Sequence, residues 1–389
     1  MNHGHIAVAG GGIGGLAAAL ALVRAGFEVS VHERTPLAGE AGAGMTITPS
    51  GSRVLRALGL GDWIHRCGER PECGVVCDGR SGDVLAWNTR RDEVEARHGA
   101  EYFQVHRADL HAALAGELAR LAPGALRAND GFESVEQHEG GVRVRFAGSG
   151  LIEADALVGA DGAGSTVRAA LFGADRPEFT GCVAYRGLVP RELLPDVPIE
   201  QQSAMFVGPG RLFVRYLVRQ GRLVSYVCIT RTLGWIHEGW ALGAGRAELL
   251  AELGGWHPPL RALVERTPEG ALFKWGLFER APLPAWTRGA TTLLGDAAHP
   301  MLPFLGQSAV MALEDAAILA RAFEAAGSAR EALTRYERAR RERAERVVVL
   351  SRETGMRLLT HVVEPGRAGT PLTSASLGLM DYDATTAAV

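Results

Sequence analysis

Five glycines fall within residues 10–15, and they separate two segments of different character. Residues 5–9 are short and apolar, as in a buried strand, whereas residues 16–25 are rich in alanine and leucine, as in a helix. Three of the glycines have the spacing G-x-G-x-x-G, which combines a tight turn, room for a pyrophosphate and close packing of helix on strand: Gly10, Gly12 and Gly15. The sequence therefore predicts a strand, turn and helix that bind a dinucleotide at the helix N-terminus.

An acidic residue follows this unit at the expected distance. Residues 27–33 alternate as a second strand and end at Glu33, about twenty residues after the turn, where an acidic side chain binds ribose hydroxyls. Glu33 disfavours the 2′-phosphate of NADP at this site, while FAD and an unphosphorylated nicotinamide dinucleotide both stay open.

A second segment places Asp161 and Gly162 after the apolar residues 156–158. Ligands of open α/β sheets bind beyond the carboxyl ends of strands, so Asp161 is well placed for a cofactor contact. Ser165 is a candidate N-cap of the helix that follows. An ordinary Asp-Gly turn is the alternative interpretation.

A third segment combines a strand, an aspartate, a loop and a helix start. Residues 291–294 predict a buried strand that leads to Asp296, and the loop after it contains helix-blocking prolines and Gly306. A helix is expected from about Ser308 to Phe323. Gly306 would let the backbone approach a planar ring, and a helix N-terminus favours an anionic ring such as reduced flavin.

Composition limits the remaining functions. The 389 residues suffice for two or three domains, and 41 basic against 44 acidic residues give no charge excess for nucleic acid or an anionic membrane. The five cysteines lack paired spacing with histidines, so we expect neither a disulfide framework nor a metal site. The first residues do not resemble a signal peptide, and we expect a cytoplasmic protein.

Residues 331–346 alternate arginine and glutamate, which predicts a helix with a solvated, charge-paired face.

The middle of the chain predicts a second domain. Four alternating segments, at residues 182–189, 203–207, 212–218 and 223–229, indicate an antiparallel sheet, which a strand pair within residues 73–87 joins. We expect residues 1–72, 98–178 and 282–389 to form a cofactor domain with C-terminal helices. Residues 73–97 and 179–281 would form the sheet domain, with the substrate cavity at the interface.

The three motifs, with Ala-Ala-His-Pro after Gly295-Asp296, resemble those of the group A FAD-dependent aromatic monooxygenases, the para-hydroxybenzoate hydroxylase superfamily. Stretches at 42–45, 105–110, 185–190 and 380–384 are most similar to its salicylate hydroxylase and hydroxynicotinate monooxygenase branch. The resemblance implies an α/β fold: a Rossmann-type (GR2-like) FAD-binding domain with an inserted antiparallel β-sheet substrate domain and C-terminal helices. It also implies an enzyme that consumes NADH or NADPH and O2 and hydroxylates an aromatic or heteroaromatic small molecule through a flavin C4a-hydroperoxide.

The resemblance also implies which residues contact FAD. They are Gly10, Gly12, Gly15, Glu33, Arg34, Gly44, Arg107, Asp161, Asp296, Pro303, Leu305, Gly306, Gln307 and Ser308. Ser308 stands where the family usually has glycine. Because serine can cap a helix, we expect the loop geometry to be kept.

Substrate contacts are predicted on the sheet and on the loop that faces it. The candidates for lining the cavity are Thr46, Thr48, Met205, Tyr216 and Pro303, and the candidates for catalysis are Tyr216, Arg215 and His299. Strand alternation allows only one of Arg215 and Tyr216 to face the cavity. We expect His299 to order its loop rather than to abstract a proton.

Relatives that deprotonate a phenol often have a histidine where this chain has Leu212, and some have one in place of Thr46. Either Tyr216 or water therefore takes the proton, or the substrate is an electron-rich indole, amine or polyketide ring that needs no base. A flavin dehydrogenase or reductase that does not use oxygen, and a regulatory protein with a degenerate nucleotide site, are the other functions we consider. The oligomeric state is expected to be a monomer or a homodimer.

Overall fold

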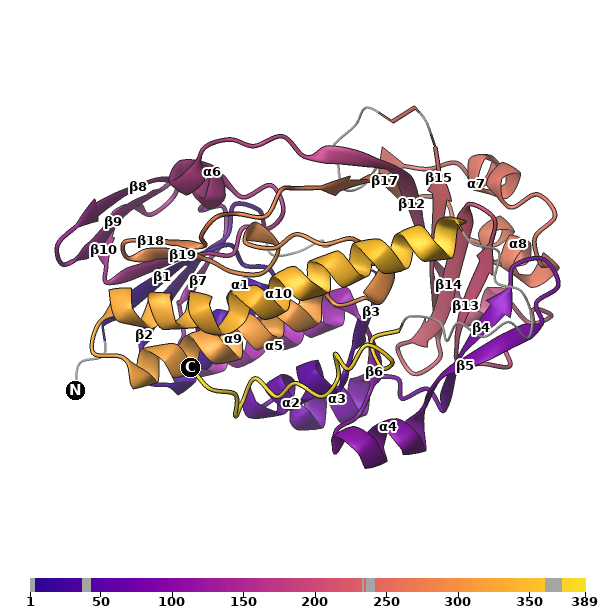
Figure 1. The fold of residues 1–389 in the computed structure, drawn as a ribbon, viewed down its shortest axis with the longest axis horizontal. Coiled ribbons are helices and arrows are strands. Elements are labelled where there is room, and N and C mark those ends of the chain that lie inside the picture. The colour runs from indigo at the N-terminus through magenta and orange to yellow at the C-terminus, as the bar shows by residue number, and fades with distance from the viewer. Residues whose placement is uncertain (1–3, 37–42, 233, 236–241, 361–372) are drawn as a thin grey trace.

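The computed structural model describes residues 4–36, 43–232, 234–235, 242–360 and 373–389. Within these residues, a parallel sheet with one antiparallel edge strand occupies one end of the molecule (Figure 1). Its strand order is β18-β19-β11-β1-β2-β7, formed by β1 (His5–Ala9), β2 (Glu28–His32), β7 (Leu126–Arg127), β11 (Ala156–Gly159), β18 (Thr287–Arg288) and β19 (Thr291–Leu293). Strands β1, β11 and β19 are parallel neighbours, so the three motifs that follow them meet at one edge of the sheet.

Helices and a small sheet pack around this parallel sheet. Helix α1 (Ile13–Arg24) packs against α5 (Arg107–Leu121) and α9 (Ser308–Ala325), and α10 (Ala329–Thr360) packs on α9. An antiparallel sheet of β8 (Phe132–His138), β9 (Gly141–Phe146) and β10 (Gly150–Ala154) contacts β1, β11 and α6 (Thr166–Phe172). There the Phe146 ring stacks on His32 of β2 with ring centroids 3.7 Å apart.

The second large sheet forms the other end of the molecule (Figure 1). Its order is β16-β17-β12-β15-β14-β13-β4-β5, formed by β4 (Cys73–Asp78), β5 (Val84–Arg90), β12 (Glu178–Pro190), β13 (Ser203–Gly208), β14 (Arg211–Val218), β15 (Leu223–Arg231), β16 (Leu242–Gly243) and β17 (Leu272–Glu279). One face buries a core with α7 (Arg246–Glu252) and α8 (Pro258–Glu265). The other face packs against the loop before α9 and the end of α10, which runs from one large sheet to the other (Figure 1).

The remaining elements are short. They are β3 (Gly44–Ile47), which pairs with β6 (Phe103–His106), the helices α2 (Pro49–Ala57), α3 (Gly61–Cys67) and α4 (Arg91–His98), and the 3-10 turns η1 (Arg191–Leu193), η2 (Gly295–Ala297) and η3 (Pro303–Leu305). None of the helices in the described part of the chain has the length and apolar character needed to cross a bilayer.

The predicted elements around the three motifs are confirmed. The helix after the glycine turn ends at Arg24, and Gly26 follows its cap with a φ of 92°, a conformation that favours glycine. In the second sheet all pairs are antiparallel as expected except β13 with β4, which is parallel. The reason is connectivity, because β4 enters the sheet from an earlier part of the chain and not through a hairpin.

The predicted solvated helix at residues 331–346 is only partly correct. Glu331 does pair with Arg335 one turn later, at 2.7 Å. Arg340, however, is fully buried, because it shares a face with Tyr336 and Ala344, which lie one turn before and after it in the core. Its charge is therefore part of the interior of the protein and must be paired there.

Candidate active site

The glycine turn has the geometry that a pyrophosphate requires. Gly10 has a φ of 111°, and a Cβ at Gly10 or at Gly15 would overlap a backbone carbonyl oxygen, that of Ala160 or of Gly10 respectively. A Cβ at Gly12, in contrast, would have nothing within 4 Å. Gly12 is also the N-cap of α1, so the open space lies at the N-terminus of that helix. These residues fit the phosphates of FAD.

Glu33 lies beside this turn as an ionised acceptor. Its Oε2 accepts a hydrogen bond of 2.7 Å from the Gly11 amide, and its Oε1 accepts bonds from the amide and hydroxyl of Thr35. Burial raises the pKa of Glu33, but these hydrogen bonds outweigh burial and hold the pKa below its ordinary value. Arg34 is exposed next to it.

Helix α5 begins at the same edge. The amide of Arg107, its first residue, donates a 2.7 Å hydrogen bond to Ala43, next to Gly44; Gly42 lies outside the described residues. One turn further along the helix, His111 Nε2 bonds to the Gly11 carbonyl at 2.8 Å. His111 was not among the predicted site residues, although it lies four residues after Arg107 and therefore on the same face of the helix.

Asp161 accepts hydrogen bonds from the residues that begin the helix of the second motif. The amides of Thr166 and Val167 donate to its Oδ2 at 2.7 and 3.1 Å, and Ser165 donates to its Oδ1. Ser165 accepts from the Arg168 amide at 2.9 Å, so the N-cap prediction is confirmed. In this geometry Asp161 holds the start of α6, and its contact with FAD stays a prediction.

The third motif forms the loop that faces the second sheet. Asp296 Oδ1 accepts a 2.7 Å hydrogen bond from Ser308 Oγ. Pro303 and Gly306 are exposed, and Gly306 has a φ of 62°. The prediction that Ser308 caps α9 is wrong: Gln307 is the N-cap, because its carbonyl accepts from the Met311 amide, and the Ser308 hydroxyl is engaged by Asp296.

His299 is part of a buried ion cluster behind this loop. Its ring is 4% exposed, and its Nε2 lies 2.6 Å from Asp315 Oδ2, which also accepts from the Gly295 amide at 3.0 Å. Arg340 completes the cluster, with Nε 2.7 Å from Asp315 and Nη1 2.9 Å from Glu314. Although burial raises the pKa of Asp315, the charges of His299 and Arg340 outweigh burial and lower it to about 2. This placement supports a role for His299 in ordering the loop, and no contact supports proton transfer.

Tyr216 and Arg215 lie on opposite faces of β14, as alternation predicts. Tyr216 is packed so closely against Gly44 that a Cβ on Gly44 would overlap its ring. Arg215 is 4% exposed on the other face, where its Nη1 donates to the Gln201 carbonyl at 2.6 Å and burial lowers its pKa to about 10. The structure therefore contradicts the catalytic role predicted for Arg215, because its guanidinium points away from the cofactor side.

Around Tyr216, hydroxyl groups cluster beside the loop between Asp296 and Ser308, which we call the flavin loop. Tyr102 donates to Thr46 Oγ1 at 3.4 Å, and Thr46 Cβ lies 3.8 Å from where a Cβ of Gly306 would be. Burial raises the pKa of Tyr216 well above its ordinary value, so the phenol stays protonated.

Thr48, in contrast, is 1% exposed and pairs with Ser50 at 3.1 Å, so the substrate contact predicted for it is wrong. The alternation of β3 stops before Thr48, which is the N-cap of α2.

A row of partly exposed side chains crosses the second sheet next to Tyr216. Strand pairing aligns Met205, Val214, Val227 and Arg186 on neighbouring strands, and we call these four residues the sheet stripe. The next aligned row on the same face, which includes Leu212, is buried against Phe304 of the flavin loop. The sheet stripe thus presents an apolar surface with one cation at its end, and the Arg186 guanidinium lies 5.1 Å from the Trp275 ring. Arg186 was not among the predicted site residues.

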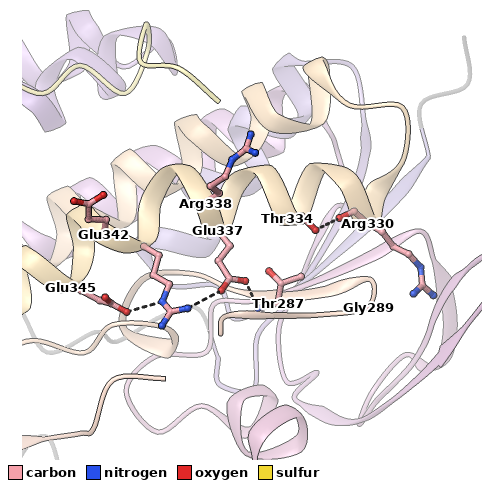
Figure 2. A pocket seen from close by; sticks show the side chains of 9 residues that line it. Thr287, Gly289, Arg330, Thr334, Glu337, Arg338, Glu342 and Glu345 are labelled. Carbon is pink, nitrogen blue, oxygen red and sulfur yellow. Dashed lines mark hydrogen bonds and ion pairs between the residues drawn. The ribbon is translucent and has the colours of Figure 1, made fainter. Parts of the chain in front are cut away.

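A separate surface groove of about 780 Å³ lies between α10 and the β18–β19 hairpin (Figure 2). Some of its charges pair with each other: Arg341 lies 2.7 Å from Glu345 and 3.7 Å from Glu337. Figure 2 labels both glutamates along the groove. The groove is at the amino end of β19, whereas Asp296 follows its carboxyl end. It is therefore distinct from the edge where the three motifs meet.

Comparisons with known proteins agree with this geometry. A family model described as "FAD binding domain" matches residues 4–201 and 277–351. The 6-hydroxynicotinate 3-monooxygenase of Bordetella bronchiseptica is 38% identical over 352 residues, which are 90% of this chain and 90% of that protein. The 3-amino-4-hydroxybenzoate 2-monooxygenase PtmB3 of Streptomyces platensis is 37% identical over 355 residues, 91% of this chain and 88% of that protein. The crystal structure of Klebsiella pneumoniae HpxO complexed with FAD and uric acid has a TM-score of 0.79 at 27% identity and covers 90% of this chain and 87% of that one.

The chain belongs to the FAD-binding-domain family of flavoprotein monooxygenases. The predicted branch is confirmed, and so is the predicted fold class. The protein is thus an FAD-dependent monooxygenase, with NADH or NADPH as the reductant and O2 as the oxidant.

Proposed function

We propose that this monooxygenase hydroxylates a small aromatic or heteroaromatic ring that carries an anionic substituent such as a carboxylate. The observation that carries the proposal is the sheet stripe, whose apolar part lies beside Tyr216 and whose end is the cation of Arg186. A flat ring fits against Met205, Val214 and Val227, and a carboxylate fits a guanidinium. The names of the two relatives above, a hydroxynicotinate and an aminohydroxybenzoate monooxygenase, support a ring carboxylate.

The chain's own residues account for binding and orientation. Gly10, Gly12 and Gly15 would hold the pyrophosphate of FAD, Glu33 the adenosine ribose and Asp296 the ribityl hydroxyls. Bound FAD supplies reduction by the nicotinamide and transfer of an oxygen atom from O2 to the ring.

The sheet side supplies a dry surface and a protonated phenol. The valines of the sheet stripe and the buried row with Leu212 exclude water from the ring. Tyr216 stays protonated, so it donates a hydrogen bond to a ring oxygen that gains negative charge.

A neutral, electron-rich ring is the second candidate substrate. It is favoured by Leu212, which occupies the position of a histidine base in related enzymes and is buried among apolar side chains. An indole or an aromatic amine needs no deprotonation. The proportion of acids and neutral rings among active compounds decides between the two classes.

The test is a screen of aromatic acids, pyridines, indoles and phenols for stimulated oxidation of NADH and NADPH. Oxygen uptake and mass spectrometry of the product are measured on the same samples. We expect an aromatic acid to stimulate all three signals together. Stimulated reductant oxidation without oxygen uptake would indicate the dehydrogenase alternative, and purified protein that binds no FAD would indicate a degenerate site.

Arg186 can be tested once a substrate is found. We expect Arg186→Gln to lower kcat/KM for the acid by about 10- to 100-fold, the value of a charge-assisted hydrogen bond, while the corresponding amide is little affected. Arg186→Lys should recover part of the loss. Arg222→Gln, on an exposed arginine in the turn between β14 and β15, is the matched control. Equal losses for acid and amide would refute the proposed contact.

Four further properties complete the proposal. Residues 1–72, 98–178 and 282–389 would form the cofactor domain, and residues 73–97 and 179–281 the substrate domain. The protein would act in the cytoplasm, as a monomer or homodimer, without nucleic acid as a partner. Limited proteolysis, cell fractionation and light scattering test these points.

A further inference from the structure

Residues 373–389 return to the flavin loop after the last helix. Ser374, 8% exposed, accepts a 2.9 Å hydrogen bond from Gln307 Nε2 and donates one of 3.1 Å to the Leu305 carbonyl. Leu305 and Gln307 flank Gly306, the exposed residue of positive φ. A single hydroxyl therefore links both sides of the turn at Gly306.

Gln307 is the most constrained residue of this turn. Its side chain is 1% exposed, its carbonyl begins the hydrogen bonding of α9, and its Nε2 also approaches the Leu305 carbonyl at 3.4 Å. Its Oε1 has no hydrogen-bond partner among the described residues. Buried polar atoms are rarely left unpaired, so this oxygen fits a donor that enters the site. Ser374 fixes the amide in the orientation that leaves Oε1 free for that donor.

The segment that carries Ser374 is itself firmly anchored. Arg53 of α2 donates to the carbonyls of Met380 and Tyr382 at 3.2 and 3.1 Å. Arg343 of α10 donates to the Leu379 carbonyl at 3.0 Å, and its guanidinium lies 4.1 Å from the Tyr382 ring centroid. Leu379 and Met380 are buried in addition. The hydroxyl of Ser374 is thus held by a platform that does not depend on the flavin loop.

We propose that Ser374 is a positioning residue for FAD, acting through Leu305 and Gln307 from a segment remote in sequence from all three motifs. It holds the turn at Gly306 and the N-terminus of α9 in the conformation that receives the isoalloxazine. A helix N-terminus stabilises negative charge close to it, so its placement affects the reduced flavin more than the oxidised one. Loss of the hydroxyl leaves Gln307 Nε2 and the Leu305 carbonyl with only their long 3.4 Å contact to each other, and this weaker link relaxes the turn.

The test compares Ser374→Ala with wild type and with Ser376→Ala, which removes an exposed hydroxyl of the same segment whose bonds to Thr373 are local. FAD dissociation constants are measured by flavin fluorescence on the apoprotein, together with the midpoint potential of the bound flavin and the melting temperature of the apoprotein. We expect Ser374→Ala to bind FAD about five- to tenfold more weakly, as the loss of one buried hydrogen bond implies, and at a more negative potential. Ser376→Ala should match wild type.

Two further variants separate positioning from folding. Ser374→Thr keeps the hydroxyl and should restore FAD affinity and potential, whereas Ser374→Cys keeps the volume with weaker hydrogen bonds and should lie between wild type and alanine. Wild-type affinity and potential in Ser374→Ala would overturn the proposal. A lower melting temperature with unchanged FAD affinity and potential would also overturn it, since that result describes a merely structural residue.

Discussion

The hydroxyl of Ser308 donates a 2.7 Å hydrogen bond to Oδ1 of Asp296. The bond joins the first residue of α9 to the aspartate that follows β19, across the loop that faces the second sheet. The related enzymes that the sequence resembles usually have glycine at this position, which offers no such contact. The serine thus orients the carboxylate expected to bind the ribityl hydroxyls.

Ser308→Ala is expected to weaken FAD binding by about two- to tenfold, because a hydrogen bond of this kind contributes about 0.5–1.5 kcal/mol. Flavin fluorescence titration of the apoprotein measures the change. Asp296→Ala removes the carboxylate itself and should lose FAD, so this variant sets the upper limit for the loss of FAD affinity. Unchanged or tighter binding by Ser308→Ala would show that the hydroxyl does not prepare Asp296 for the cofactor.

The glycine turn allows a sharper comparison. Gly12→Ala places a methyl group in open space, so the apoprotein should lose less than about 1 kcal/mol, yet FAD affinity should fall by more than about 100-fold because the methyl takes the place of a phosphate. Gly15→Ala drives a methyl into the Gly10 carbonyl and should destabilise the apoprotein itself by about 1–3 kcal/mol or more. Thermal unfolding with and without FAD distinguishes the two. If both variants behaved alike, the separate roles of the two glycines would be wrong.

The glycine turn and the sheet stripe differ in how far the sequence alone can predict them. The glycine turn and the aspartates follow strands directly, so a local pattern reveals both the element and the chemistry, and the parallel order β1, β11 and β19 brings them together. The sheet stripe comes from four strands, and its alignment depends on pairing register, which no local pattern contains.

Where a site residue was predicted wrongly or not predicted at all, the deciding feature is again one that no local pattern contains. Arg215 and Tyr216 alternate, but the sequence does not say which of them faces the cofactor. Thr48 continues the spacing of Thr46, yet the strand ends between them and α2 begins. Ser374 lies among small polar residues, and only its tertiary contacts distinguish it.

Tyr216→Phe tests the hydroxyl that we propose to contact the substrate. We expect kcat on a phenolic substrate to fall by about 10- to 100-fold, the value of a hydrogen bond to a charged group, with FAD affinity unchanged. Because burial raises the pKa of Tyr216, the wild-type enzyme should show no activity change from tyrosine deprotonation at or below pH 10. Tyr185→Phe is the control, since Tyr185 is buried in the core on the opposite face of the sheet and its hydroxyl donates to the exposed carboxylate of Glu248. Wild-type kcat and KM in Tyr216→Phe would remove Tyr216 from the mechanism.

The buried cluster of His299, Asp315 and Arg340 predicts a pH-dependent stability. Asp315 has a pKa of about 2 in the folded protein, below the value of about 3.9 for an unperturbed aspartate, so its charge stabilises the fold above about pH 4 and ceases to do so as the pH falls towards 2. Asp315→Asn leaves the Arg340 charge with one partner fewer and should cost about 3–5 kcal/mol at pH 7.

Unfolding measured from pH 7 down to pH 2 checks this prediction. The difference in unfolding free energy between wild type and Asp315→Asn should be largest at neutral pH and shrink below about pH 4, because protonation of Asp315 removes the same charge that the variant lacks. Glu345→Gln, which removes a partly exposed partner of Arg341, should cost less than about 1 kcal/mol at every pH. A difference that stays constant down to pH 2 would mean that the Asp315 charge does not stabilise the loop that carries Asp296.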